Sequence, residues 1–229
     1  MNFLSATVEL PSYRFIPLRN TGSIPRAGTT AIFPQEIVLY KYNRITSLFT
    51  DSVRILGDTI QTDSILTPSP IVSCYENGRI YFLASKTFLG GPVAEEHLIY
   101  TVVDTNLNVV IPQRRIISSK LPTLFRQLFD LRFHNDRLYL SYTHTYQNGA
   151  FSISRILARI LEIEPSGQVR KDTVAGIMPD TLSKANQYSQ YATQILKDAD
   201  QPTDFFVAGI GLSGNQDGFG MSERILTFA

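Results

Sequence analysis

Apolar and polar residues alternate along most of this chain, and clusters of turn-forming residues interrupt the alternation at short intervals. A period of two is typical of β-strands that bury one face, whereas the spacing typical of helices is scarce. The pattern therefore predicts an all-β protein. Two segments, 121–128 and 182–196, also have spacings compatible with a helix, although the second equally fits a loop followed by a strand.

Two hairpins are marked most clearly by their turn residues. The first runs from PIVSCYE through Asn77-Gly78 to RIYFLAS, and the second from LFDLRFH through Asn135-Asp136 to RLYLSYTH. An Asn-Gly pair supplies the positive φ angles of a two-residue type I′ turn. We expect antiparallel hairpins at both pairs, with the inner strands PIVSCY and LFDLRF more buried than the outer strands VVIPQRRI and QVRKDT.

The two hairpins belong to a longer repeat. Asn77 and Asn135 are separated by 135 − 77 = 58 residues, and the similarity continues through HLIYTVVDTNLNVV and SRILARILEIEPSGQV, with turns expected at Thr105-Asn106 and Pro165-Ser166-Gly167. Each repeat offers four strands. A unit of this size cannot bury both of its faces alone, so the repeat predicts stacked, four-stranded antiparallel blades of a β-propeller.

The repeat also predicts how the chain is divided. We expect an N-terminal extended arm over residues 1–30 and a propeller-like domain over residues 31–229. Within that domain we expect a half blade, two whole blades and a partial blade, over residues 31–60, 66–119, 124–175 and 188–229. Because closed propellers usually have four to eight blades, the prediction is an incomplete or fragmentary propeller, or further strands hidden in the arm.

Composition excludes several classes of protein. The formal net charge is only +1, which gives no broad electrostatic footprint for nucleic acid. Cys74 is the single cysteine, so no internal disulfide framework is possible. Neither a secretory signal nor a run of 18 apolar residues is present, and we expect a soluble protein without membrane insertion. The sequence does not specify its cellular compartment.

No cofactor or metal site is predicted. His97, His134 and His144 lack the spacing of metal ligands, and we expect His134 to face solvent. The segment Gly209–Gly214 matches the dinucleotide pattern GxGxxG, but turn residues follow it instead of a helix. We interpret this segment as a glycine-rich loop between strands.

Two short motifs precede the hairpins. Thr67-Pro68-Ser69-Pro70 lies before NGRIYF, and Phe129-Asp130-Leu131-Arg132 lies before NDRLYLSYTH. Over about residues 66–170 the chain thereby resembles the five-bladed β-propellers of glycoside hydrolases and glycoside phosphorylases, which carry Asn-Pro-Ser-like and Glu-Asp-Pro-Arg segments before similar hairpins. Phe129 and Leu131 depart from the second motif, so Asp130 and Arg132 are the two residues that match it.

The resemblance implies a pocket near the propeller axis. It makes Asp130 the candidate catalytic carboxylate, and Arg132, Tyr142 and His144 candidate substrate-binding residues. An aspartate can accept a proton or orient water, and an arginine fork can hold hydroxyls or phosphate. The alternative is that Asp130 and Arg132 pair within the blade and that tyrosines such as Tyr142 pack on the surface of the sheet. No second carboxylate is identifiable, since Glu95, Glu96, Asp104 and Asp204 are expected in solvated loops or at strand edges.

Two functions therefore stay open. The first is a carbohydrate-binding or glycoside-processing propeller that acts on an unidentified glycan, and as an enzyme it would be similar to glycoside hydrolases or phosphorylases. The second is a non-catalytic propeller or β-rich module of a larger assembly, with a protein partner bound at blade edges or at the N-terminal arm. The absence of tryptophan, which commonly stacks on sugars, fits the second function.

Overall fold

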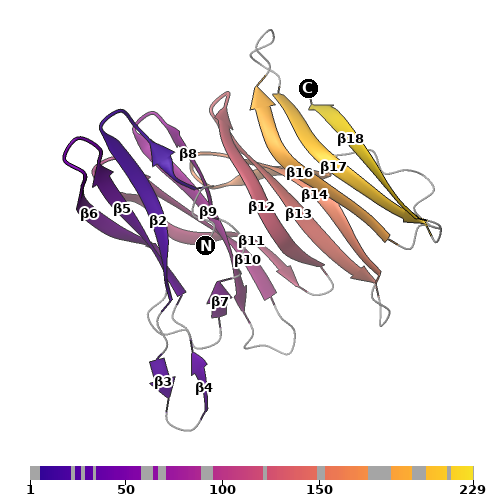
Figure 1. Cartoon of the computed structure of the whole chain (residues 1–229), viewed down its shortest axis with the longest axis horizontal. Helices are drawn as coiled ribbons and strands as arrows, with labels where there is room; N and C mark the ends of the chain where they lie inside the picture. Colours follow the sequence, from indigo (N-terminus) through magenta and orange to yellow (C-terminus); the bar gives the residue numbers. More distant parts are fainter. Residues whose placement is uncertain are drawn as a thin grey trace. The chain divides into compact units, whose positions relative to one another are not determined.

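The computed structural model describes most of the chain, and all its regular elements in that part are β-strands (Figure 1). The described residues are 6–21, 24–26, 29–32, 35–57, 64–66, 71–88, 95–120, 123–148, 153–174, 187–197, 205–215 and 218–228. Within these ranges there is no helix of the length and apolarity needed to traverse a membrane. The chain forms two compact units, Met1–Ser118 and Ser119–Ala229.

The first unit begins with a four-stranded antiparallel sheet in the order β1-β2-β5-β6. Its strands are β1 (Val8–Glu9), β2 (Tyr13–Thr21), β5 (Gln35–Asn43) and β6 (Leu48–Leu56). A separate hairpin of β3 (Ile24–Arg26) and β4 (Thr29–Ile32) lies between β2 and β5 in the sequence. Residues 1–30, predicted as an extended arm, thus include two strands of a sheet, and these strands complete the half blade expected from residue 31 onward.

The second sheet of this unit is the first complete repeat. It contains β8 (Val72–Glu76), β9 (Arg79–Phe88), β10 (Glu95–Asp104) and β11 (Val109–Lys120), with the short β7 (Ser64–Leu66) also paired to β9. Alternate residues of the two sheets meet in one apolar core, which includes Phe15, Ile37, Leu39, Ile80, Phe82, Ile99 and Val103. Full burial of such a side chain contributes about 1.5–3 kcal/mol, so this core is the main source of the unit's stability.

The second unit contains the second repeat and three further strands. The repeat consists of β12 (Thr123–His134), β13 (Arg137–Asn148), β14 (Ile153–Ile163) and β15 (Val169–Val174). It is followed by the antiparallel strands β16 (Gln187–Lys197), β17 (Phe205–Asn215) and β18 (Gly218–Phe228). A single parallel pair, Ile156 with Ser189, links β14 to β16. The chain is therefore all-β and built from propeller-like antiparallel blades.

Both predicted hairpin turns are confirmed. Asn77 and Gly78 have φ angles of 49° and 77°, and Asn135 and Asp136 have φ angles of 46° and 58°. Positive φ at both central residues is the requirement of a type I′ turn. The turns expected at Thr105-Asn106 and Pro165-Ser166 are also present. The turn residues thus fix the register of each blade.

The predicted difference in burial between inner and outer strands is confirmed for the described residues. Most residues of β8 and of the second half of β12 are buried or half-buried, whereas most residues of β11 and β15 are exposed. Among the exposed positions are Arg114, Arg115, Arg170 and Lys171. Strands whose faces are covered by other parts of the protein need apolar residues, whereas strands that face water tolerate charge.

The structure tests three local predictions. The described part of 121–128 lies in β12 and that of 182–196 lies in β16, so neither described part is helical and the strand expected in the second segment is present. The apparent helical spacing in β12 arises because β-bulges interrupt its period of two. The Gly209–Gly214 segment is part of β17 and pairs with β16 and β18 instead of forming a loop.

Candidate functional site

The two residues of the matched motif lie on one face of β12. Asp130 pairs with Ser141 of β13 and Arg132 pairs with Tyr139, while Leu131 between them pairs with Leu140 and is buried. A register shift between Leu128 and Asp130 marks a bulge just before the motif. Bulges re-aim the side chains that follow them, and here the bulge places Asp130 on the opposite face from Leu128.

The Asp130 carboxylate is held by two donors through the same oxygen. Arg132 Nε and the backbone N–H of Ile195 each donate to Asp130 Oδ2 over 3.0 Å. The Asp130 side chain is 18% exposed and that of Arg132 is 46% exposed. Because Ile195 belongs to β16, this carboxylate fastens β12 to the next group of strands. Its position is fixed, and Oδ1 takes no part in either bond.

Two hydroxyl groups that the sequence reasoning did not select share the face of Asp130. Ser141 and Thr143 alternate with Tyr142 along β13, and both are completely buried. Ser141 Oγ donates to the backbone carbonyl of Asp130 over 3.5 Å. Among the residues that the structure describes, Thr143 Oγ1 is a buried hydroxyl without a hydrogen-bond partner. Polar residues at alternate positions of an apolar strand were the signal that could have identified this row.

Tyr142 lies on the other face of the blade, away from Asp130. It pairs with Leu128 and Arg159 and is 1% exposed. Its hydroxyl donates to the Asp172 carboxylate over 2.9 Å, and Arg159 Nε donates to the same carboxylate over 2.9 Å. Burial raises the pKa of Tyr142, and the negative charge of Asp172 raises it further. The structure thus places Tyr142 in a network that joins β13, β14 and β15.

His144 lies near the middle of β13, where its backbone pairs with Phe125 and Leu157. Its side chain lies outside the described residues, so its role in substrate binding stays a prediction. Thr67–Pro70 and Asp204 also lie outside the described residues. His134 is buried beside the ring of Tyr139, with the ring centroids 6.4 Å apart, so the expectation that it faces solvent was wrong.

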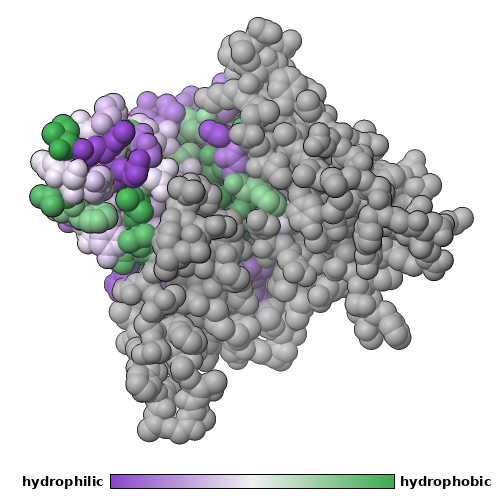
Figure 2. All heavy atoms as spheres, viewed as in Figure 1, coloured by the Kyte–Doolittle hydropathy of each residue, from purple (hydrophilic) through white to green (hydrophobic). Residues whose placement is uncertain are grey.

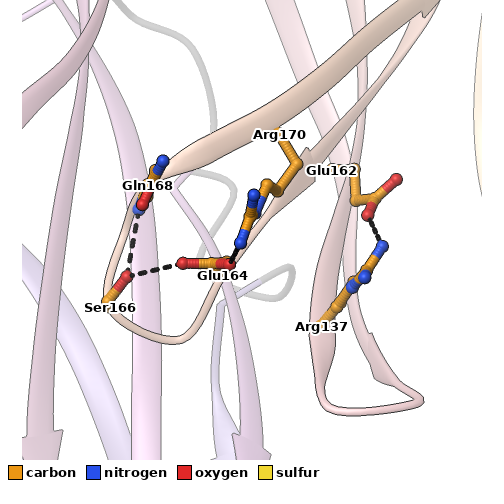
Figure 3. Close-up of polar contacts among 6 residues, drawn as sticks. All are labelled: Arg137, Glu162, Glu164, Ser166, Gln168 and Arg170. Carbon is orange, nitrogen blue, oxygen red and sulfur yellow. Dashed lines mark hydrogen bonds and ion pairs between the residues drawn. The ribbon is translucent and has the colours of Figure 1, made fainter.

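Glu162 is a carboxylate on the same sheet face as Arg132, since both residues pair with Tyr139. Two strand spacings separate β12 from β14, roughly 10 Å across the sheet. Glu162 forms an ion pair with Arg137 (Figure 3). That hydrogen bond, followed by the charge of Glu162, raises the pKa of Arg137. The sequence reasoning did not consider this residue as a second carboxylate.

A second polar cluster closes the turn between β14 and β15. Glu164 accepts from Ser166 Oγ over 3.3 Å and forms an ion pair with Arg170, while Ser166 Oγ accepts from the backbone N–H of Gln168 over 3.4 Å (Figure 3). These bonds satisfy polar groups of the turn and link it to the start of β15. They give the cluster a structural role in the blade.

The first unit contains buried ionisable residues, and one of them, Glu96, was expected to be solvated. Glu96 is buried and accepts from Ser85 Oγ over 2.5 Å. His97 is also buried, with Nδ1 2.9 Å from Ser118 Oγ and Nε2 3.6 Å from Glu95 Oε2. The expectation for Glu96 was therefore wrong, because its strand lies in the interior of the unit. Within the described ranges, no three His, Cys, Asp or Glu residues are grouped to hold a metal ion.

Comparisons with known proteins define the fold. No family model and no curated protein matches the sequence. The GH93 α-L-arabinofuranosidase of Fusarium graminearum in complex with arabinobiose is similar in structure, with a TM-score of 0.54 at 10% identity over 99% of this chain and 66% of that chain. This similarity shows the fold alone. The solved structures that resemble the chain include glycoside hydrolases with propeller folds.

Two further similarities are weaker. The GH32 β-fructofuranosidase of Bombyx mori has a TM-score of 0.48 at 7% identity, covering 98% of this chain and 46% of that chain. An N-acetylgalactosamine deacetylase of F. plautii, solved with blood group B trisaccharide, has a TM-score of 0.47 at 8% identity, covering 94% of this chain and 69% of that chain. The chain thus spans about half to two-thirds of these proteins.

Proposed function

We propose that the chain is a glycan-binding, glycoside-processing protein and that Asp130 supplies its functional carboxylate. The observation that supports this proposal is the Asp130–Arg132 pair, which is oriented by a backbone amide and has its arginine half exposed. A fixed carboxylate next to a guanidinium can accept sugar hydroxyl protons while the guanidinium holds hydroxyl or phosphate oxygens. The fold, which glycoside hydrolases share, is consistent with this function.

Cleavage of a glycosidic bond generally uses two carboxyl groups on either side of that bond. In this proposal Asp130 is the first of them, and Glu162 is the candidate for the second because it lies on the same sheet face. Arg132 orients the substrate, and the buried Ser141, whose hydroxyl donates to the Asp130 carbonyl, supports the position of Asp130. Tyr142 is assigned to the structural network with Asp172 instead, and His144 stays a candidate substrate-binding residue.

A panel of labelled glycosides and glycans, assayed with and without phosphate, tests this function. We expect turnover of at least one member, lost in Asp130→Asn and reduced in Glu162→Gln. Arg132→Ala should weaken binding, and Tyr142→Phe is the matched control that should retain both binding and turnover. Binding that survives both Asp130→Asn and Arg132→Ala would place the glycan site elsewhere in the protein.

A second candidate function is a non-catalytic module of a larger assembly. The bond from the Ile195 amide to Asp130 favours it, because a carboxylate used to fasten β16 to β12 has a structural purpose. Under this alternative the panel gives no turnover. Asp130→Asn and Arg132→Ala then change thermal stability and leave any contact with a protein partner intact.

A further inference from the structure

A cluster of one exposed and two half-buried aromatic rings lies on the hairpin of β5 and β6, and the proposed function does not use it. The Phe49 ring lies 5.7 Å from that of Tyr40 and 5.3 Å from that of Tyr42, with interplanar angles of 71° and 65°. Phe49 is 58% exposed. We call Tyr40, Tyr42 and Phe49 the aromatic platform. Figure 2 shows apolar atoms scattered among polar ones over this part of the first unit.

The platform lies on the face of its sheet that is turned away from the core. Tyr40 and Tyr42 alternate with Leu39, which is completely buried in that core. Tyr42 pairs with Phe49 across the two strands, so these two rings share a face. The edge-to-face contacts of the Phe49 ring with both tyrosines stabilise its orientation.

The turn beside the platform is well braced. Asn43 Oδ1 accepts from the backbone N–H groups of Ile45 and Thr46, over 2.9 and 3.1 Å. Arg44 Nη1 donates to the Leu10 carbonyl over 3.3 Å, which ties the turn to the neighbouring chain segment. A platform held in this way loses little conformational freedom when a ligand binds, and such preorganisation favours affinity.

Several charged side chains of this hairpin have partners within the protein, and the backbone N–H of Ser52 donates to Asp51 Oδ1 over 2.7 Å. Lys41 Nζ lies 4.4 Å from the centre of the Tyr13 ring and donates to the Thr105 carbonyl over 2.8 Å. Arg54 lies 3.9 Å from Glu36. The exposed side chains of the hairpin also offer four hydroxyl groups, those of Thr46, Ser47, Thr50 and Ser52. This surface matches an uncharged ligand rich in hydroxyls better than a phosphate or an acidic peptide.

We propose that the aromatic platform is a second glycan-binding surface, which takes a neutral polysaccharide chain independently of Asp130. A sugar ring presents apolar C–H groups on its face and hydroxyls at its edge, so it stacks on an exposed ring and bonds to polar groups nearby. Large exposed apolar residues gathered on one hairpin generally mark an interaction site. The proposal shares only its class of ligand with the proposed function.

Affinity electrophoresis tests this proposal. The full chain is run in native gels that contain arabinan, inulin or mixed-linkage β-glucan, and its retardation is measured. We expect at least one polysaccharide to retard the protein and Phe49→Ala to weaken the apparent affinity about tenfold. Phe49→Tyr keeps a ring and should bind as the wild type does, whereas Phe49→Leu keeps only the apolar bulk and should lose about as much affinity as Phe49→Ala. Ile45→Ala is the matched control, because Ile45 is 79% exposed on the same hairpin and lacks a ring.

Three results would overturn the proposal. The first is a wild-type protein that none of the three polysaccharides retards. The second is retained binding in Phe49→Leu with loss in Ile45→Ala, which would indicate apolar docking of a protein or a second copy. Sedimentation at several concentrations would then reveal self-association. The third is retardation lost in Asp130→Asn and kept in Phe49→Ala, which leaves the proposed function standing and removes the platform from glycan binding.

Discussion

The two complete blades, β8–β11 and β12–β15, share their turns and differ in how far their strands are buried. In the first blade every residue of 80–86 and 96–103 is buried. In the second blade Leu131, Leu138 and Leu140 are buried, but Arg132 is exposed and Asp130 is partly exposed. The same backbone therefore supports a fully buried slab in one unit, with the polar Lys86, Glu96 and His97 inside it, and a partly exposed Asp130–Arg132 pair in the other.

The outer turns of the two blades show what the repeat does conserve. Leu107 has a φ of 66° and Gly167 a φ of 85°, at the same place in the two turns. In the first turn the Leu107 N–H donates to the Asp104 carbonyl over 3.0 Å, and in the second the Gly167 N–H donates to the Glu164 carbonyl. Leu107 is buried in the core of its unit, which offsets the cost of its left-handed backbone. Backbone geometry is thus maintained even where the residue type is not.

The largest expected effect comes from truncation of an apolar side chain in the buried slab of the first blade. Phe82→Ala should lower the free energy of unfolding by about 3–5 kcal/mol, because Phe82 is completely buried in the core of the first unit. Urea denaturation followed by fluorescence measures this loss. Val110→Ala, at an exposed position of β11, is the control and should change stability by less than about 0.5 kcal/mol. Equal effects at the two positions would refute the buried slab.

A smaller effect is expected from the tyrosine network of the second blade. Tyr142→Phe removes the hydroxyl bonded to Asp172 and should cost about 0.5–1.5 kcal/mol at neutral pH. The pKa of Tyr142 is raised above its ordinary value of 10.0, so the folded state holds this proton more tightly than the unfolded state does. The stabilisation is therefore complete below pH 10 and is lost as the pH rises above that value.

Melting temperatures measured from pH 8 to pH 11.5 test this pH dependence. Burial also raises the pKa of Tyr100 in the first blade, so Tyr100→Phe is a matched variant. Each substitution should make the decline of stability above pH 10 less steep. An identical decline in the wild type and in both variants would contradict the assignment of the raised pKa values to these two phenols.

The smallest expected effect is an exchange between the two hairpin turns. Gly78 and Asp136 occupy the same turn position, and both have positive φ. Gly78→Ala should destabilise the first blade by about 1 kcal/mol through the backbone alone, since a Cβ at Gly78 meets no atom within 4 Å. Asp136→Gly should stabilise the second blade slightly because glycine adopts this conformation freely. A stabilising Gly78→Ala together with a destabilising Asp136→Gly in thermal melts would indicate that side-chain contacts control the turns.

Much of the fold was predictable because it depends on local signals. The Asn77-Gly78 turn and the alternation around it specify a hairpin without reference to the rest of the chain. The strand β2 was hidden because Pro17 lies within it and proline usually argues against a strand. The glycines of β17 were read as a loop for a similar reason, although their backbones pair with both neighbouring strands.

The candidate site was less predictable, because it depends on which face each side chain occupies. Asp130 and Arg132 could be selected from a short motif. The second donor to Asp130 Oδ2, the backbone N–H of Ile195, could not, because Ile195 is distant in sequence. Tyr142 was grouped with Asp130 and Arg132 as a candidate substrate-binding residue, yet a bulge and a one-residue step place it on the opposite face. Side-chain faces follow from the register, and bulges change the register without a clear sequence signal.

The most direct test of the central claim is to compare Asp130→Asn with the wild type in turnover of the glycoside panel and in thermal melting. Asparagine keeps the shape of the side chain and an oxygen that can accept from the Ile195 amide, but it cannot transfer a proton as a carboxyl group does. We predict loss of turnover with a nearly unchanged melting temperature. A large drop in melting temperature, with no glycan turned over by the wild type, would contradict the claim. Asp130 would then have only a structural role, the hydrogen bond that joins β12 to β16.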